Sequence, residues 1–217
     1  MAEVLAGDAS VTSNGLVDVE GYYAFGIMAE AYGNTTVANG GTIDAYSANA
    51  SAFGIYAFAD QGDALVDNSG SVITLSQYNT TGVTAISNYG DSTITSAGSI
   101  DITSNAGSAR GAFAFSAYGT ASVTNGGDLV VSAAAGTAYG AIALGEYATV
   151  ANTGNVDVDG ELIAQGLRAG GRQAAAIDNG GDVLAYSYSG SATGLFANAY
   201  YGAADASNSG SAYASSG

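Results

Sequence analysis

Three carboxylates lie close together in the stretch Asp157-Val158-Asp159-Gly160-Glu161. Side chains two positions apart on a strand point the same way and lie about 7 Å apart, a separation that suits the acid and base of an inverting glycosidase. Charged strand faces are usually only solvated, however. We therefore keep a polysaccharide-active enzyme that uses Asp157, Asp159 and Glu161 as an alternative to a non-enzymatic role.

The sequence lacks the residues that several other kinds of catalytic and metal sites require. The chain has no His and no Cys, which excludes Ser-His-Asp and Cys-His arrangements and zinc clusters. Asp8, Asp63 and Asp91 recur at one corner of the repeat described below and carry oxygen ligands that suit calcium, but Asn34 and Thr120 interrupt this column. Aspartate is also favoured in turns by its own hydrogen bonding. We expect no enzymatic activity, no cofactor and no bound metal.

The charge balance narrows the choice of partners. Nineteen acidic residues stand against three arginines, Arg110, Arg168 and Arg172, and the net charge is −16. Such a surface repels DNA, RNA and anionic lipid. No apolar span of 18 residues occurs, so we expect no membrane insertion of this segment. The absence of Cys is compatible with export, and we expect an extracellular or bacterial cell-surface location.

An internal repeat of 26 to 29 residues positions all of these groups. A first glycine column recurs once per repeat, and a second recurs on another side, each time followed three residues later by Ala. The first column consists of Gly15, Gly41, Gly70, Gly98, Gly127, Gly154, Gly181 and Gly210, and the second of Gly26, Gly54, Gly82, Gly111, Gly140, Gly166 and Gly194. We expect both columns to serve corners that need a positive φ or a close backbone approach.

The apolar runs between these punctuating residues are about five residues long and alternate with a period of two, which predicts strands. Val66 and Val72 are examples of the positions predicted to face inward on two of the strands of each repeat. The position after that of Val72 is often acidic, as at Asp101, and is predicted to face outward. Repeats that cannot bury their apolar faces alone gain a core by stacking. We predict an all-β, right-handed parallel β-helix (β-solenoid) of about eight coils with three strands per coil, forming one domain over residues 1–217.

Two residues before each glycine of the first column the residue is Asn in six of the eight repeats. Stacked amides at one position would hydrogen-bond from coil to coil. The predicted ladder consists of Asn39, Asn68, Asn125, Asn152, Asn179 and Asn208.

The third side carries large apolar residues at alternate positions. If the Ile and Ala of its Gly-Ile-x-Ala pattern point inward, the large residues form an exposed stripe larger than a soluble monomer normally shows. We predict that this stripe contacts a partner protein; with the reversed phase it would be core. Its members are Met28, Tyr56, Phe58, Ile86, Phe113, Phe115, Ile142, Leu144 and Phe196.

The repeat, written GDAxVxNSGxIxVxS followed by AxGIxAxA, resembles the strand repeats of bacterial autotransporter passenger domains and related large surface adhesins. Residues 62–64, 68–70 and 54–57 and their equivalents carry this resemblance over residues 7–217. It implies a structural or adhesive rod without chemistry. We expect self-association, lateral or end to end, or attachment to a host or matrix molecule, and a chain that is a fragment of a longer solenoid or a fibre subunit.

A flat-surface binder of the ice-binding type is a further alternative. It needs a regular array of Thr on one outward face. Thr12, Thr95 and Thr124 share such a column, but Asp67 and Asp178 interrupt it.

Overall fold

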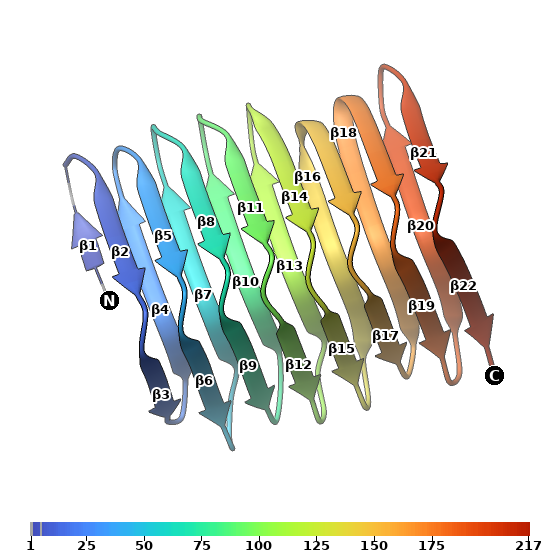
Figure 1. The fold of residues 1–217 in the computed structure, drawn as a ribbon, viewed down its shortest axis with the longest axis horizontal. Coiled ribbons are helices and arrows are strands. Elements are labelled where there is room, and N and C mark those ends of the chain that lie inside the picture. Colours follow the sequence, from blue (N-terminus) through green and yellow to red (C-terminus); the bar gives the residue numbers. More distant parts are fainter. Residues whose placement is uncertain (1, 5) are drawn as a thin grey trace.

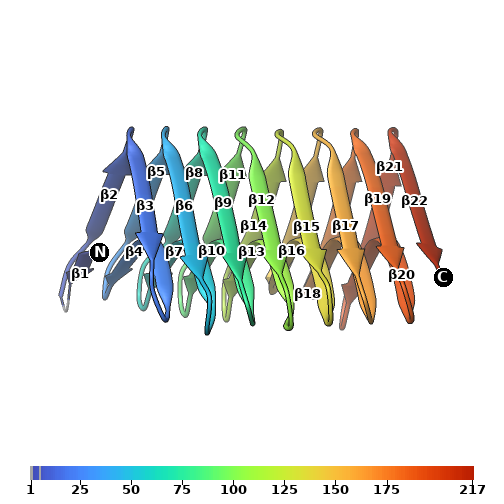
Figure 2. The same cartoon turned by 90° about the horizontal axis from the view of Figure 1, so that it is seen from below.

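The chain folds into a right-handed parallel β-solenoid of about seven turns, as the repeat predicts. The computed structural model describes residues 2–4 and 6–217. Every strand pair in this part of the chain is parallel, and no helix occurs in it. Figure 1 shows the coils side by side from the N-terminal to the C-terminal end, and Figure 2 shows the strands of one side stacked along the rod.

Each turn has three sides. The first side contains β2 (Ala9–Ser13), β5 (Thr35–Asn39), β8 (Ala64–Asn68), β11 (Ser92–Ser96), β14 (Thr120–Asn125) and β21 (Ala204–Asn208). The second side contains β3 (Leu16–Glu20), β6 (Thr42–Ser47), β9 (Ser71–Ser76), β12 (Ile100–Ser104), β15 (Leu129–Ala133), β17 (Val156–Gly160), β19 (Asp182–Ser187) and β22 (Ser211–Ser216). The third side contains β1 (Ala2–Val4), β4 (Ala24–Ala31), β7 (Ala52–Ala59), β10 (Thr80–Ser87), β13 (Ala109–Ser116) and β20 (Ser191–Ala199).

Two long strands join the third side to the first. These are β16 (Thr137–Asn152) and β18 (Ile163–Asn179), and they merge both sides into one 14-stranded sheet, while the second side is a separate 8-stranded sheet. Eight strand layers are separated by seven intervals, which is why the predicted eight coils correspond to about seven turns. In other coils a turn such as Tyr89-Gly90 separates the third side from the first, whereas β16 and β18 continue through this corner as strands.

The alternation of apolar and polar residues places the core as the sequence predicts. Val37, Val66, Ile94 and Val123 of the first side are fully buried, as are Ile43, Val72 and Ile100 of the second. On the third side Ile55, Ala57, Val83 and Ala85 point inward. The register of the next coil continues each column, so one main core runs from Ile27 to Ala185, and Ala24, Ala45 and Ala52 form a small second cluster.

The glycines of the first column are needed because successive coils approach closely there. A Cβ on Gly98 would lie 1.8 Å from the carbonyl oxygen of Gly70, and one on Gly127 would lie 2.1 Å from that of Gly98. Positive φ occurs only at Gly7 among the described residues. Close backbone approach, rather than positive φ, is therefore the reason for this column.

The second glycine column interrupts the alternation of the third-side strands that carry it. A Cβ on Gly54 would meet Val72 Cγ1 at 2.3 Å. The register passes from the pair Phe53 and Thr81 to the pair Ile55 and Val83 and leaves the glycines unpaired. Consequently the residue before the glycine points outward, although strict alternation would turn it inward.

Buried asparagine side chains form a ladder between coils. Asn39 Nδ2 donates to Asn68 Oδ1 at 2.8 Å, and Asn125, Asn152, Asn179 and Asn208 continue in the same way at 2.7 to 2.8 Å. Ser96 takes one place in this column and accepts from Asn68 Nδ2 at 3.1 Å. The ladder supplies hydrogen-bond partners to the buried amides from Asn39 to Asn179, while Asn208 at its end is exposed.

The corner aspartates form a second ladder. Asp63 Oδ1 accepts a hydrogen bond from the backbone N–H of Asp91 at 2.8 Å, and Asp91 Oδ1 accepts from that of Thr120 at 2.7 Å. Asp8 accepts in the same way from Asn34. These carboxylates thus tie one coil to the next instead of converging on one point.

Candidate functional site

The outward side chains of the third side form a surface that we call the third face. Its strands are β4, β7, β10, β13 and β20 with the first halves of β16 and β18, and it has three columns in register. The columns are Phe25, Phe53, Thr81, Arg110, Tyr139, Gln165 and Thr193; Met28, Tyr56, Thr84, Phe113, Ile142, Arg168 and Phe196; and Glu30, Phe58, Ile86, Phe115, Leu144, Gly170 and Asn198.

The structure places the predicted stripe outward. Phe58, Phe113 and Phe115 are partly exposed, and Phe196 has 39% of its surface exposed. Ile142 is the exception, because Phe113 and Arg168 flank it in its column and only 4% of its surface is exposed. Eight of the nine predicted residues therefore contribute accessible surface, and the reversed phase is wrong.

Aromatic and cationic groups pack on each other across this face. Phe25 and Phe53 stack with centroids 4.8 Å apart, and the guanidinium of Arg110 lies 5.4 Å from the ring centroid of Phe113. Arg168 lies over Phe196 in the same way at 5.9 Å. Such contacts hold the side chains in fixed positions at the surface.

The electrostatics of the face differ from those of the whole chain. Glu30 is the only acid in the three columns from β4 to β20, and Glu3 of β1 pairs with it in register. Burial, with a smaller contribution from Glu30, raises the pKa of Tyr56. Seven strands about 4.8 Å apart and about 20 Å of strand length give roughly 650 Å². This is the area of the whole face, polar members included, and it approaches the roughly 800 Å² that one partner buries in a stable complex.

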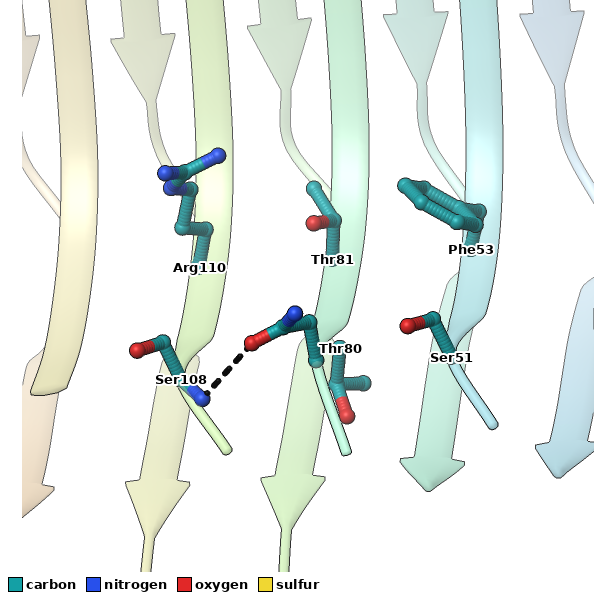
Figure 3. Close-up of a pocket in the computed structure, with 7 residues that line it drawn as sticks. Ser51, Phe53, Thr80, Thr81, Ser108 and Arg110 are labelled. Atoms are coloured by element: carbon teal, nitrogen blue, oxygen red, sulfur yellow. Dashed lines mark hydrogen bonds between the residues drawn. The ribbon is translucent and has the colours of Figure 1, made fainter. Parts of the chain in front are cut away.

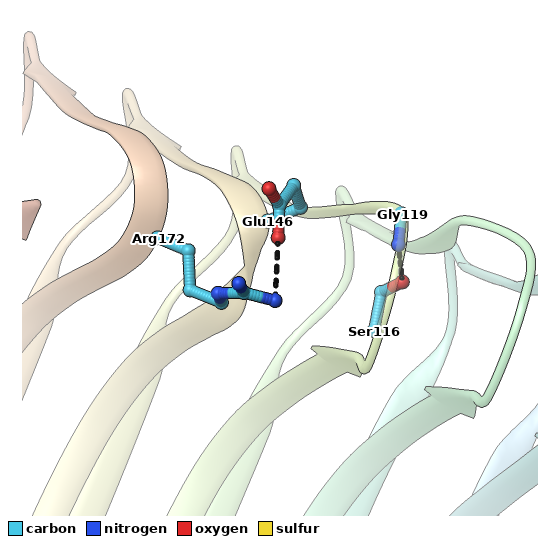
Figure 4. A network of polar contacts seen from close by, with 4 residues as sticks. All are labelled: Ser116, Gly119, Glu146 and Arg172. Carbon is cyan, nitrogen blue, oxygen red and sulfur yellow. Dashed lines mark hydrogen bonds and ion pairs between the residues drawn. The ribbon is translucent and has the colours of Figure 1, made fainter. Parts of the chain in front are cut away.

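One edge of the third face borders the corner at which β16 and β18 continue from the third side to the first, shown in Figure 4. Arg172 of β18 forms an ion pair with Glu146 of β16 at 3.3 Å, and the N–H of Gly119 donates to Ser116 Oγ at 2.7 Å. A shallow depression of about 450 Å³ lies beside them, where Gly170 offers no side chain. Its Arg172 is already engaged by a carboxylate, so the depression offers no free charge.

The second side presents eight of the 19 acids. They occupy or border its outward columns and are Asp18, Glu20, Asp44, Asp101, Asp128, Asp157, Asp159 and Asp182. Among the described residues no three acidic side chains are grouped as metal ligands would be.

The structure brings together only part of the predicted carboxylate site. Asp157 and Asp159 both point outward from β17 and are half-buried, whereas Glu161 lies beyond the end of that strand. Burial and the charge of Asp157 raise the pKa of Asp159. Asp157 lines a shallow groove of about 380 Å³ with Asp182, and neither Asp159 nor Glu161 lines this groove.

The outward columns of the first side are mixed. Thr12, Thr95 and Thr124 are exposed there, as the alternation predicts, but Asp67 and Asp178 lie in the same column. The surface is therefore not a uniform Thr array.

Sequence reasoning missed one column of the third face, which includes Phe25, Phe53, Arg110 and Tyr139. The available signal was the residue before each glycine of the second column. The glycine and the residue after it both point inward, so the residue before the glycine points outward, and the sequence alternation does not show this.

No match was found when the chain was compared with models of known protein families, with curated proteins and with solved structures. Within residues 2–4 and 6–217, no helix has the length and apolar character to cross a membrane.

Proposed function

We propose that the chain is a non-enzymatic structural rod that works outside the cell and attaches to another surface through its third face. The observation that carries this proposal is the third face, roughly 650 Å² in area, on which aromatic and aliphatic side chains outnumber polar ones and which no segment of the described chain covers. A solenoid is well suited to such a role because it displays many side chains in fixed register along one axis.

The arrangement of the carboxylates also favours a non-enzymatic role. Asp157 and Asp159 lie on an open strand face, and the shallow groove beside them is lined by Asp157 and Asp182 but not by Asp159. A hydrolase would need both groups to flank a bound glycosidic bond in a water-excluding cleft.

The resemblance of the repeat to autotransporter passengers and surface adhesins supports an extracellular or bacterial cell-surface location. In such a setting the rod would hold a binding face away from its point of anchorage. The absence of Cys is in keeping with this location.

Attachment can be tested with a labelled chain on intact cells and on extracellular matrix. The double variant Phe58→Glu with Phe115→Glu places two charges on the third face, and its matched control, Leu65→Glu with Ile73→Glu, places them on the other two sides at residues that are each 39% exposed. We expect the first variant to lose most of the attachment and the second to retain it. Equal attachment by both would refute the role of the third face.

Lateral self-association is a second candidate, favoured by the separation of charge. Arg110 and Arg168 lie on the third face, whereas acids dominate the second side. The third face of one rod and the second side of another would attract each other at low ionic strength. Light scattering over a range of salt and protein concentrations tests this: assembly that dissolves in high salt supports it, and a monomer throughout excludes it.

A further inference from the structure

A notch interrupts the third face at Thr81. In its column the neighbours on both sides are long, since Phe53 precedes Thr81 and Arg110 follows it in register. Figure 3 shows these three side chains in a row on adjacent strands, with Ser51 and Ser108 in a second row beside them. The short Thr81, which is only 7% exposed, forms the bottom of a depression of about 270 Å³.

The wall on one side of the notch is aromatic and the wall on the other is cationic. Arg110 makes no ion pair with any described residue, and its guanidinium is held over the ring of Phe113. Phe53 stacks on Phe25 and so keeps its ring fixed at the rim. Arg168 likewise makes no ion pair with a described residue, so Arg172 is the only paired cation in the described part of the chain.

The lining of the notch also offers polar groups that make no hydrogen bond within the described part of the chain. Asn79 Oδ1 accepts a hydrogen bond from the N–H of Ser108 at 3.1 Å, which orients its amide nitrogen. In the described part of the chain that nitrogen has no acceptor, and the hydroxyls of Ser51, Thr81 and Ser108 have no partner. Thr80, by contrast, is bonded inward to the carbonyl oxygen of Thr103.

We propose that this notch binds a carboxylated sugar, that is, one uronate unit of an acidic glycan. The C–H face of the ring packs on Phe53, the carboxylate pairs with the guanidinium of Arg110, and the ring hydroxyls bond to Asn79 and the free hydroxyls. This inference deepens the proposed function, because it names a ligand class for the third face.

Size and charge favour this class over other anions. The notch lies at the lower end of the volumes of small-molecule sites and so fits one ring. It contains a single cation, whereas a nucleic acid would need several to neutralise its phosphates. Four free polar groups are also more than an isolated carboxylate side chain of a peptide would use.

Ligand-observed NMR with D-glucuronate at millimolar concentration tests the inference, with D-glucuronamide as a ligand of the same ring and no charge. We expect glucuronate to bind and glucuronamide to bind at least tenfold more weakly. Arg110→Gln should weaken glucuronate binding at least tenfold, while Arg172→Gln, which removes the same charge outside the notch, should leave it unchanged. Thr81→Phe should abolish binding by filling the notch, with the fold checked by circular dichroism.

Equal binding of both ligands, full binding by Arg110→Gln, or no binding by the unaltered chain would overturn the inference. These failures are distinct from failure of the proposed function. Suppose that the sugar-binding test fails but the chain still attaches to cells, and that Phe58→Glu with Phe115→Glu abolishes the attachment. The role of the third face is then supported and only the sugar site is refuted.

Discussion

Ser96 and Asn125 are paired in register between β11 and β14, yet no hydrogen bond joins their side chains. Ser96 Oγ donates to the carbonyl oxygen of Gly98, and Asn125 Oδ1 is left buried without a donor. The asparagine ladder is therefore broken into two parts at this point, and the break leaves an acceptor unsatisfied.

Replacing Ser96 by asparagine should stabilise the protein. In Ser96→Asn the new amide would donate to Asn125 Oδ1 and accept from Asn68, as the pair Asn39 and Asn68 already does. Satisfying one buried acceptor is worth about 1 kcal/mol or more in the free energy of unfolding. Urea denaturation of Ser96→Asn checks this, and Thr95→Asn, exposed on the same strand, is the control. A loss of stability in Ser96→Asn would show that the column has no room for the amide.

The first glycine column predicts a sharp contrast between adjacent residues. A Cβ on Gly127 would lie 2.1 Å from the carbonyl oxygen of Gly98, whereas one on Gly126 meets nothing nearer than 3.7 Å. Gly127→Ala should therefore cost about 3 kcal/mol or more, because backbone must move, and Gly126→Ala should cost about 1 kcal/mol or less. Thermal unfolding of both variants measures the difference. Similar melting temperatures would mean that the coils do not approach as closely as described.

The inward columns make a comparable prediction. Val123 is fully buried and Thr124 beside it is exposed. Val123→Asp should cost several kcal/mol or prevent folding, since a buried unpaired charge is far more costly than a lost Val side chain. Thr124→Asp should change stability by about 0.5 kcal/mol at most. An unaltered melting curve for Val123→Asp would contradict the assignment of this column to the core.

The acidic pair on β17 predicts a pH effect. Burial and the charge of Asp157 raise the pKa of Asp159 above its ordinary value of 3.8. A carboxyl with a higher pKa in the folded state favours unfolding once it ionises, so its penalty appears as the pH rises from 3.8 through the folded pKa. Asp159→Asn should then stabilise the protein at neutral pH, and the gain should vanish below about pH 3.8. A gain that persists or grows in acid would show that charge is not its cause.

Titration can be followed residue by residue. Hydrogen bonds from Asn88 and Gln61 lower the pKa of Asp60, whereas that of Asp159 is raised. Carboxyl-detected NMR should therefore show Asp60 titrating below Asp159. Asp157→Asn should bring the pKa of Asp159 closer to 3.8 by removing the neighbouring charge. If Asp157→Asn left it unchanged, burial alone would account for the shift.

The fold was predictable because each inward position is repeated in coil after coil. Val66, for example, shares its column with Val37 and Ile94, so one ambiguous residue could not alter the phase. The direction of Phe53 was not predictable in this way, because Gly54 and Ile55 both point inward and interrupt the alternation. The notch also depends on Thr81 lying between Phe53 and Arg110, which only the register of three strands reveals.

The most direct test of the account is a hydroxyl-radical footprint of the chain while it is attached to a cell surface. Attachment through the third face predicts that Met28, Phe113 and Phe115 become protected, while Tyr46 and Tyr213 on the second side stay labelled as in the free chain. Protection of Tyr46 and Tyr213 with unchanged labelling of Phe113 and Phe115 would contradict the account and move the attachment surface to the acidic side.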